Sequence, residues 1–320
     1  MLAGRILLAI GLGLAATCAH AAGFRFIEVP ADTEGPALAG AIWYPCAAPP
    51  GEVKLARRTI PAVKDCPIEG ERLPLVVISH GRIGSFAGHH DTAEALADAG
   101  FMVAAIDHPG DSSGDKSRSW ELSVMIERPA AIKRLIDFML GASPAAGKID
   151  AQRIGLFGFS RGGYTGLVAV GAEPHFAIAL PRCAGASLPI CEDIRNKRYP
   201  PSLVHDARIK AAVIADPLPI FFDRDSLAGV KVPIDLWASQ TGGDGVEPHD
   251  VAALEQSLPA GHAYHVVANA GHFAFLAPCP PAAARENAEP CVDAPGFDRV
   301  AFHAQLNAAM VAFFRQQLGP

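Results

Sequence analysis

Residues 153–170 read RIGLFGFSRGGYTGLVAV, and their pattern indicates the fold class of the whole chain. Its first five residues form a short apolar run that predicts a buried strand, and its last eight are small and apolar, which favours a helix. Between them, Gly158-Phe159-Ser160-Arg161-Gly162 matches the G-x-S-x-G pattern, in which a serine stands on a sharp strand-to-helix turn. Glycines two positions before and after the serine keep strand and helix from colliding. The flanks favour a nucleophilic Ser160 over the alternative, an ordinary glycine-rich turn.

Length and composition set limits on the rest of the chain. It has 320 residues, of which 50% are hydrophobic, so one large core can form. The net charge is −6 and the sequence contains no basic run, so we expect no nucleic-acid partner.

The N-terminus resembles an export signal. Arg5 precedes an apolar stretch at residues 6–16, and Ala19-His20-Ala21 is an A-x-A cleavage site. We therefore predict a signal peptide at residues 1–21 and a single catalytic domain at residues 22–320. A membrane anchor is the alternative, but the apolar stretch is too short to span a bilayer, and lipidation at Cys18 is a weaker one. We expect a periplasmic or secreted protein with no stable membrane anchor after cleavage.

Export changes the interpretation of the cysteines, because disulfides persist in oxidising compartments. Six cysteines remain after the predicted cleavage, and they form three pairs that are close in sequence, each within a loop-like stretch. Six cysteines allow 15 pairings, so closeness in sequence is the only argument for a particular set. The predicted bridges are Cys46–Cys66, Cys183–Cys191 and Cys279–Cys291.

Apolar runs alternate with helical patterns along most of the chain. Strands are predicted at residues 23–29, 37–44, 73–79, 101–106, 154–158, 209–215, 232–238 and 263–267, and helices at 91–99, 121–140 and 297–316. Near-continuous apolar strands separated by helices predict a mostly parallel sheet covered on both faces. Residues 45–71 are predicted to be a surface excursion, and residues 183–203 interrupt the alternation and are predicted to form a small lid.

A nucleophilic serine needs a general base and an acid that orients the base. His272 follows a predicted late strand and a glycine-containing turn, where the base belongs, and a core or surface histidine is the alternative. Two aspartates are candidates for the acid that orients the base. Asp244 follows the strand at 232–238 and is favoured, and Asp216, at the end of the preceding strand, stays open as the alternative.

Backbone N–H groups are needed to stabilise the developing oxyanion. We predict the N–H groups of Arg161, next to the nucleophile, and of Arg82, in the loop at residues 79–84, where glycines allow the backbone to curl. His80 competes with His272 but lies in this loop. The run Gly88-His89-His90-Asp91 lacks the spacing of known metal motifs, and no G-x-G-x-x-G follows a strand, so neither metal nor cofactor is expected.

These motifs together resemble a known family. Ser79-His80-Gly81 after a strand, the pentapeptide around Ser160 and the stretch from Gly271 to Cys279 look like the predicted dienelactone hydrolases. These α/β-hydrolases are similar to platelet-activating-factor acetylhydrolases and to cutinase-like polyester hydrolases. Asp244 resembles the acid of the cutinase-like enzymes, and Asp216 that of the acetylhydrolases. Ser160 stands where dienelactone hydrolases proper have cysteine, and Arg82 where the cutinase-like enzymes have an aromatic residue.

The sequence thus predicts an α/β-hydrolase fold and an exported serine hydrolase that cleaves small-molecule carboxylic esters. A peptidase or amidase with the same triad is an alternative, because the fold does not choose between them. A non-catalytic binding protein is an alternative of another class. The sequence leaves natural substrate, acyl chain length and oligomeric state open.

Overall fold

The computed structural model describes residues 21–55, 58–286 and 288–319. The predicted signal peptide therefore lies, except for Ala21, outside the described residues. A nine-stranded sheet with the order β11-β10-β9-β8-β6-β7-β2-β1-β5 forms the centre. Its strands are β1 (Gly23–Val29), β2 (Leu38–Tyr44), β5 (Val63–Lys64), β6 (Leu73–Ser79), β7 (Met102–Ile106), β8 (Ile149–Phe159), β9 (Ile209–Ala215), β10 (Ile234–Ser239) and β11 (Ala263–Val267).

The six strands from β11 to β7 run parallel, and β2 and β1 continue the sheet antiparallel. Every residue of β6 and of β7 is buried, which explains why these strands are apolar without alternation. β1 has exposed residues between buried ones, as an outer strand does. The sequence-based prediction of a mostly parallel sheet is confirmed.

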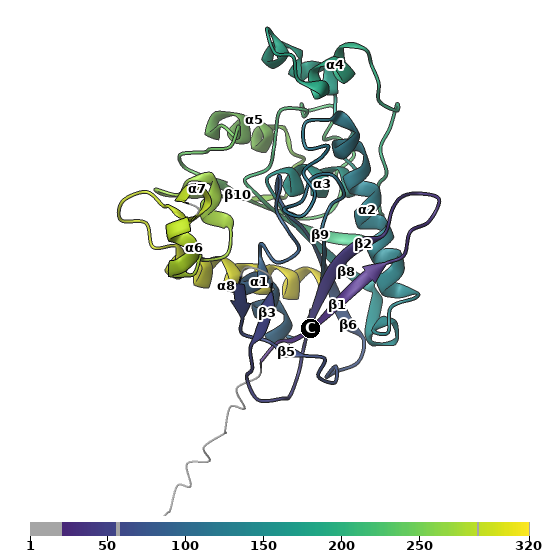
Figure 1. Ribbon diagram of the computed structural model, residues 1–320. Helices are drawn as coiled ribbons and strands as arrows, with labels where there is room; N and C mark the ends of the chain where they lie inside the picture. The colour runs from purple at the N-terminus through teal and green to yellow at the C-terminus, as the bar shows by residue number, and fades with distance from the viewer. Residues whose placement is uncertain (1–20, 56–57, 287, 320) are drawn as a thin grey trace, which may run out of the picture.

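Helices cover both faces of the sheet (Figure 1). α2 (Leu122–Leu140) and α3 (Arg161–Ala169) pack on one face, and α1 (His90–Asp98) and α8 (Arg299–Leu318) pack on the other. Each face has its own apolar core, one including Leu75, Leu156 and Ile132, the other including Val76, Phe157 and Phe314. This is the layered arrangement that the sequence predicted.

Successive strands are added toward one edge of the sheet from β6 to β7, and toward the opposite edge from β8 onward. From β6 the chain moves outward to β7 and then returns to place β8 on the other side of β6. The carboxyl ends of β6 and β8 flank this switch point, where open parallel sheets bind their ligands. Ser79-His80 and Ser160 follow these two ends, so the topology alone brings the predicted oxyanion loop beside the predicted nucleophile.

Smaller elements complete the fold. They are β3 (Val53–Leu55), β4 (Arg58–Ile60), η1 (Ala146–Lys148), η2 (Phe176–Cys183), α4 (Pro189–Arg195), α5 (Pro248–Ser257), η3 (His272–Phe275), α6 (Pro281–Glu286) and α7 (Ala288–Cys291). The predicted excursion at residues 45–71 holds β3, β4 and β5. The segment at 183–203, the predicted lid, contains α4, which lies beyond the carboxyl edge of the sheet in Figure 1.

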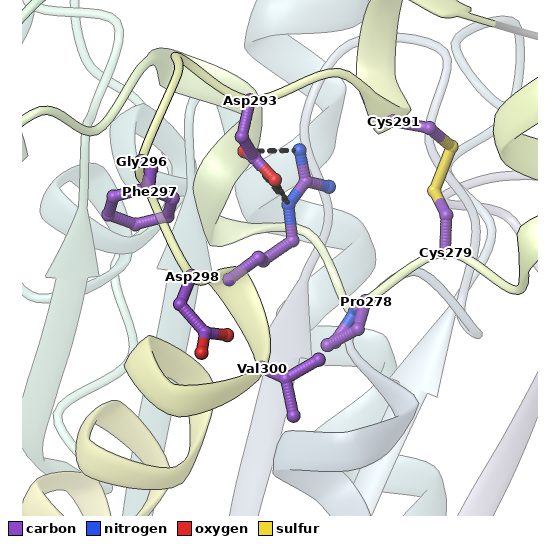
Figure 2. Close-up of a pocket in the computed structure, with 9 residues that line it drawn as sticks. Pro278, Cys279, Cys291, Asp293, Gly296, Phe297, Asp298 and Val300 are labelled. Atoms are coloured by element: carbon purple, nitrogen blue, oxygen red, sulfur yellow. Dashed lines mark hydrogen bonds and ion pairs between the residues drawn. A yellow bond between two sulfur atoms is a disulfide. The ribbon is translucent and has the colours of Figure 1, made fainter.

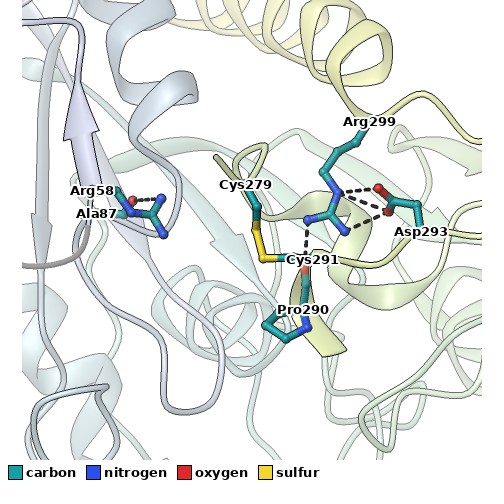
Figure 3. Close-up of a disulfide and its surroundings, with 7 residues drawn as sticks. All are labelled: Arg58, Ala87, Cys279, Pro290, Cys291, Asp293 and Arg299. Carbon is teal, nitrogen blue, oxygen red and sulfur yellow. Dashed lines mark hydrogen bonds and ion pairs between the residues drawn. A yellow bond between two sulfur atoms is a disulfide. The ribbon is translucent and has the colours of Figure 1, made fainter. Parts of the chain in front are cut away.

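Three disulfides join the cysteine pairs that closeness in sequence predicted: Cys46–Cys66, Cys183–Cys191 and Cys279–Cys291. The third closes the segment after His272, and beside it Arg299 donates to Asp293 and to the carbonyl of Pro290 (Figure 3). Among the described residues, no helix is both long and apolar enough to cross a membrane.

Candidate active site

Ser160 occupies a strained turn between β8 and α3. Its φ and ψ are 57° and −120°, outside the regions that side chains favour. The flanking glycines are a steric necessity, since a Cβ at Gly158 would lie 2.2 Å from the Gly162 carbonyl oxygen. A Cβ at Gly162 would lie 1.8 Å from the carbonyl oxygen of Ser79. The G-x-S-x-G pattern therefore forms the sharp turn that its spacing predicted.

The imidazole of His272 contacts Ser160 from the segment that follows β11. His272 is the first residue of η3, after β11, and its Nε2 lies 3.0 Å from Ser160 Oγ. The backbone N–H of His272 donates to the carbonyl of Gly242, and its ring lies 4.7 Å from that of Phe159. Ser160 is 4% exposed and His272 is 2% exposed. The two residues that the sequence predicted as nucleophile and base are thus brought together in a nearly closed site.

The carboxylate beside His272 belongs to Asp216. Asp216 Oδ2 lies 2.6 Å from His272 Nδ1, and the side chain is 1% exposed. Ser239, at the end of β10, donates its backbone N–H to Oδ1 and its hydroxyl to Oδ2. Because three donors converge on this carboxylate, it is fixed in one orientation. Ser239 was missed in the sequence, although it directly follows the apolar strand predicted at residues 232–238.

The favoured choice of Asp244 as the partner of His272 does not match the structure. Residues 242–245 all have positive φ, and this turn takes Asp244 away from the imidazole. Its carboxylate instead accepts two hydrogen bonds from the Arg82 side chain, one of them 3.3 Å from Nε. Asp216 directly follows β9, the neighbour of β8, whereas Asp244 lies five residues beyond the end of β10, and it is Asp216 that contacts His272.

The Arg82–Asp244 pair connects the loops on the two sides of the serine and histidine. Gly81, next to Arg82, touches the nucleophile, since a Cβ there would lie 3.1 Å from Ser160 Cβ. Gly243, next to Asp244, is equally close to the base, with a Cβ position 3.2 Å from His272 Cβ. The ion pair therefore spans the two loops that border the site. Its side chains are 26% and 17% exposed, so solvent reaches both.

The two predicted oxyanion donors belong to separate segments of the chain that both adjoin Ser160. Arg161 is the first residue of α3, so its N–H has no carbonyl partner within that helix. Arg82 follows Gly81 in the loop that abuts the serine. Both arginine side chains approach Trp120, with guanidinium carbons 5.2 and 5.9 Å from its ring centre. Trp120 is 49% exposed, and no sequence motif singled it out.

His80 is not free to act as a base. Its Nδ1 lies 2.7 Å from the Gly81 carbonyl and its Nε2 lies 3.1 Å from the backbone nitrogen of His108, which fixes a neutral ring that donates from Nδ1. Burial, reinforced by the Arg128 charge, lowers the pKa of His80 to about 3. The imidazole therefore serves to shape the loop.

The side chains of His89 and His90 lie in different environments. His89 is buried against the rings of Phe157 and Phe159, and His90 pairs with Glu94 one turn along α1. No group of three or more His, Cys, Asp or Glu side chains converges as a metal site within the described part of the chain.

Two cavities lie away from Ser160. One, of about 480 Å³, is lined by residues between 278 and 300 beside the Cys279–Cys291 disulfide (Figure 2). The other, of about 250 Å³, lies between α2, the segment after β7 and residues 34–38. Neither is lined by Ser160, His272 or Asp216.

The architecture and the strained serine turn define the chain as an α/β-hydrolase-fold protein. Comparison with known proteins agrees. The solved structure of a ferulic acid esterase from Streptomyces cinnamoneus superimposes with a TM-score of 0.66 at 17% identity, over 96% of this chain and 92% of that one. At 17% identity, this structural similarity is evidence for the fold alone.

Two sequence matches are more local. Residues 88–188 match the prolyl oligopeptidase family. Platelet-activating factor acetylhydrolase from Cavia porcellus is 25% identical over 186 residues, covering 43% of this chain and 41% of that protein. The match thus spans less than half the length of that relative.

Proposed function

We propose that this protein is an exported serine hydrolase that cleaves carboxylic esters through an acyl-Ser160 intermediate. The observation that carries the proposal is the unbroken hydrogen-bonded series Ser160–His272–Asp216 on a strained turn. In the proposed triad His272 is the base and Asp216 the acid, in place of Asp244. The esterase and acetylhydrolase among the similar proteins support ester cleavage.

The proposed reaction has two halves. In the first, Ser160 Oγ attacks the ester carbonyl while His272 Nε2 takes the hydroxyl proton, and the carbonyl oxygen becomes an oxyanion. Collapse of the tetrahedral adduct breaks the bond to the alcohol, which leaves with the proton from His272. In the second half, water attacks the acyl carbon, gives its proton to His272, and the free acid leaves as Ser160 is reprotonated.

The residues around the triad have separate proposed roles. Asp216 accepts a hydrogen bond from the Nδ1–H of His272 throughout without taking the proton, so that Nε2 faces Ser160, and it stabilises the imidazolium that forms transiently. The backbone N–H groups of Arg82 and Arg161 are proposed to stabilise the oxyanion. The exposed ring of Trp120 provides an apolar surface close to both arginines, where part of the substrate can pack.

Amide cleavage is the second candidate, because residues 88–188 match a peptidase family. A direct comparison of turnover of short p-nitrophenyl esters and of aminoacyl p-nitroanilides distinguishes ester cleavage from amide cleavage. We expect turnover of the esters, together with covalent labelling by a fluorophosphonate probe. Ser160→Ala should abolish labelling and lower ester turnover by about 10³-fold or more. Labelling that persists in Ser160→Ala, or cleavage of anilides alone, would overturn the proposal. A non-catalytic binding protein would show neither labelling nor turnover.

Export is proposed from the predicted signal peptide together with the three disulfides, since such bonds persist in oxidising compartments. We further propose that residues 22–320 act as one catalytic domain and that residues 183–203 act as a small lid. Two contacts connect the proposed lid and the residue before it to the rest of the domain. Arg182, just before the lid, pairs with Asp250 of α5, and Ile190 donates its backbone N–H to the carbonyl of Trp120.

A further inference from the structure

A buried Arg–Asp–Arg cluster lies beneath the proposed oxyanion site. Asp111 is fully buried, and its Oδ2 accepts hydrogen bonds from Arg128 Nη1 at 2.9 Å and from Arg161 Nη1 at 3.1 Å. Arg128, on α2, is 1% exposed. Ser119 donates its hydroxyl to the other carboxylate oxygen at 2.8 Å. Burial of charged groups is costly, so a cluster of this kind in the core calls for a functional reason.

The cluster holds the oxyanion loop at two points. Arg128 Nη2 donates to the carbonyl of His80, and the backbone N–H of Ile83 donates to Asp111 Oδ1 at 3.3 Å. Gly81 and Arg82 lie between these two fixed residues. The position of the Arg82 N–H is therefore set by Arg128 on one side and by Asp111 on the other.

The same cluster also holds the helix that begins beside the nucleophile. Arg128 Nε donates to Thr165 Oγ1 at 3.1 Å, and the Thr165 hydroxyl donates to the carbonyl of Arg161 at 2.8 Å. The Arg161 side chain contacts Asp111 and the carbonyl of Ser119. Both predicted oxyanion donors, from separate segments of the chain, are thus connected to one carboxylate and one guanidinium.

Charge in the cluster is unbalanced, because two guanidiniums face one carboxylate. Burial lowers the pKa of Arg128 to about 10, even though the Asp111 charge raises it, so the side chain remains positive at neutral pH. Burial would raise the pKa of Asp111, but the Arg128 and Arg161 charges lower it below its usual value. The excess positive charge lies behind the position where negative charge develops in the transition state, and low local polarity strengthens its effect.

We propose that Asp111 and Arg128 are positioning residues for the oxyanion hole, which hold the Arg82 and Arg161 N–H groups at a fixed separation around Ser160. This inference rests on the proposed function. Asp111 and Arg128 do not touch the triad, and neither belongs to a motif recognised in the sequence. Their role is selective for the transition state, because the hole binds the oxyanion and not the ground-state ester.

The test compares Arg128→Met and Asp111→Asn with Arg134→Met. Arg134 is a matched control, since it lies on the same helix, is 4% exposed in its side chain, and pairs with Asp32 while donating to the carbonyls of Pro30 and Pro36. Its removal deletes a guanidinium of similar burial whose hydrogen bonds go to residues 30–36 and not to the oxyanion loop, although its partner Asp32 is 46% exposed. Arg128→Lys keeps the charge without the forked geometry, and it serves if Arg128→Met does not fold.

The main readout is a pair of inhibitors with the same alkyl chain. A trifluoromethyl ketone forms a hemiketal with Ser160 and places an oxyanion in the hole, and the parent methyl ketone binds without an adduct. In Arg128→Met and Asp111→Asn we expect about 10²-fold loss of kcat and of trifluoromethyl ketone affinity. KM and methyl ketone affinity should stay within about threefold, as all of these values should in Arg134→Met. Arg128→Lys should fall between Arg128→Met and the wild type.

The outcomes are distinguishable. An equal loss of both ketones, or a similar kinetic loss in Arg134→Met, would show that the cluster contributes only to general stability and would overturn the inference. Variants that keep the wild-type preference for the trifluoromethyl ketone would also overturn it, while leaving the ester hydrolase proposal intact. If the wild-type protein itself cleaves no ester and binds no trifluoromethyl ketone, the proposed function fails.

Discussion

Replacing Asp216 with asparagine changes one atom of the proposed triad without removing volume. In the wild type, Asp216 Oδ2 accepts from both His272 Nδ1 and the Ser239 hydroxyl, and Oδ1 accepts the Ser239 backbone N–H. The backbone donor keeps the amide oxygen of Asn at the Oδ1 position, so the NH₂ group faces His272. The imidazole must then present an unprotonated Nδ1, which puts its proton on Nε2 and disables it as a base toward Ser160.

The magnitude follows from this inverted tautomer. We expect kcat to fall by about 10²–10⁴-fold, equivalent to about 3–5 kcal/mol of transition-state stabilisation. Asp244→Asn should stay within about threefold, because its carboxylate pairs with Arg82 in a site that solvent reaches. Stopped assays with p-nitrophenyl butyrate at neutral pH, with active sites counted by fluorophosphonate, measure both variants. A larger loss in Asp244→Asn than in Asp216→Asn would refute the assignment and restore Asp244 as the acid.

The other predictions concern packing, pH and covalent bonds. Gly162→Ala should lower the free energy of unfolding in denaturant by about 3 kcal/mol or more, because the added Cβ would overlap the carbonyl of Ser79 at the end of β6. Gly147→Ala is the control and should have little effect, because there is open space where its Cβ would lie. Burial lowers the pKa of His89 to about 4, so its unfolded form takes up a proton below about pH 6.5 while the folded form stays neutral. Stability should therefore fall from pH 7 to pH 5, and His89→Phe should remove about 2 kcal/mol of that loss; an unchanged pH dependence would contradict the buried neutral ring. The Cys279–Cys291 bond encloses a separation of 12 residues and should contribute about 3 kcal/mol, so the double serine variant should melt lower and lose activity as the segment after His272 loosens.

The fold could be predicted well because its inner strands, such as β6 and β7, are continuous apolar runs with clear ends, and the outer strands have recognisable boundaries too. The strands expected at residues 23–29, 73–79, 209–215 and 263–267 coincide with β1, β6, β9 and β11. β8 begins five residues earlier than expected, at Ile149, which pairs with Leu73 of β6; the residues that follow it, 150–153, are largely polar and so do not continue the apolar run. The helix α5 was not predicted, although Pro248 at its start is favoured in the first turn of a helix.

The candidate site divides into a local part and a part that depends on tertiary structure. Ser160 and His272 lie in short motifs whose neighbours constrain the backbone, so the sequence identifies both. The acid has no such motif. Asp216 and Asp244 each follow a strand, and only strand order and the path of the loop at residues 242–245 decide which of them reaches His272.

Asp111 and Arg128 show why the surroundings of the site are harder still to predict. Asp111 lies in a polar loop and Arg128 in the middle of a helix, where charged side chains are ordinarily exposed. The loop at residues 80–83 belongs to no helix or strand: the Gly84 N–H donates to the Gly81 carbonyl at 3.2 Å, and Ile83 has a φ of 54°. Such a backbone needs further partners from elsewhere in the fold, and here a guanidinium donates to a loop carbonyl and a carboxylate accepts from a loop N–H. In the proposed oxyanion role the loop must be rigid, which gives the buried charges a purpose, and the hydrogen bonds from these charges hold the irregular loop in one shape.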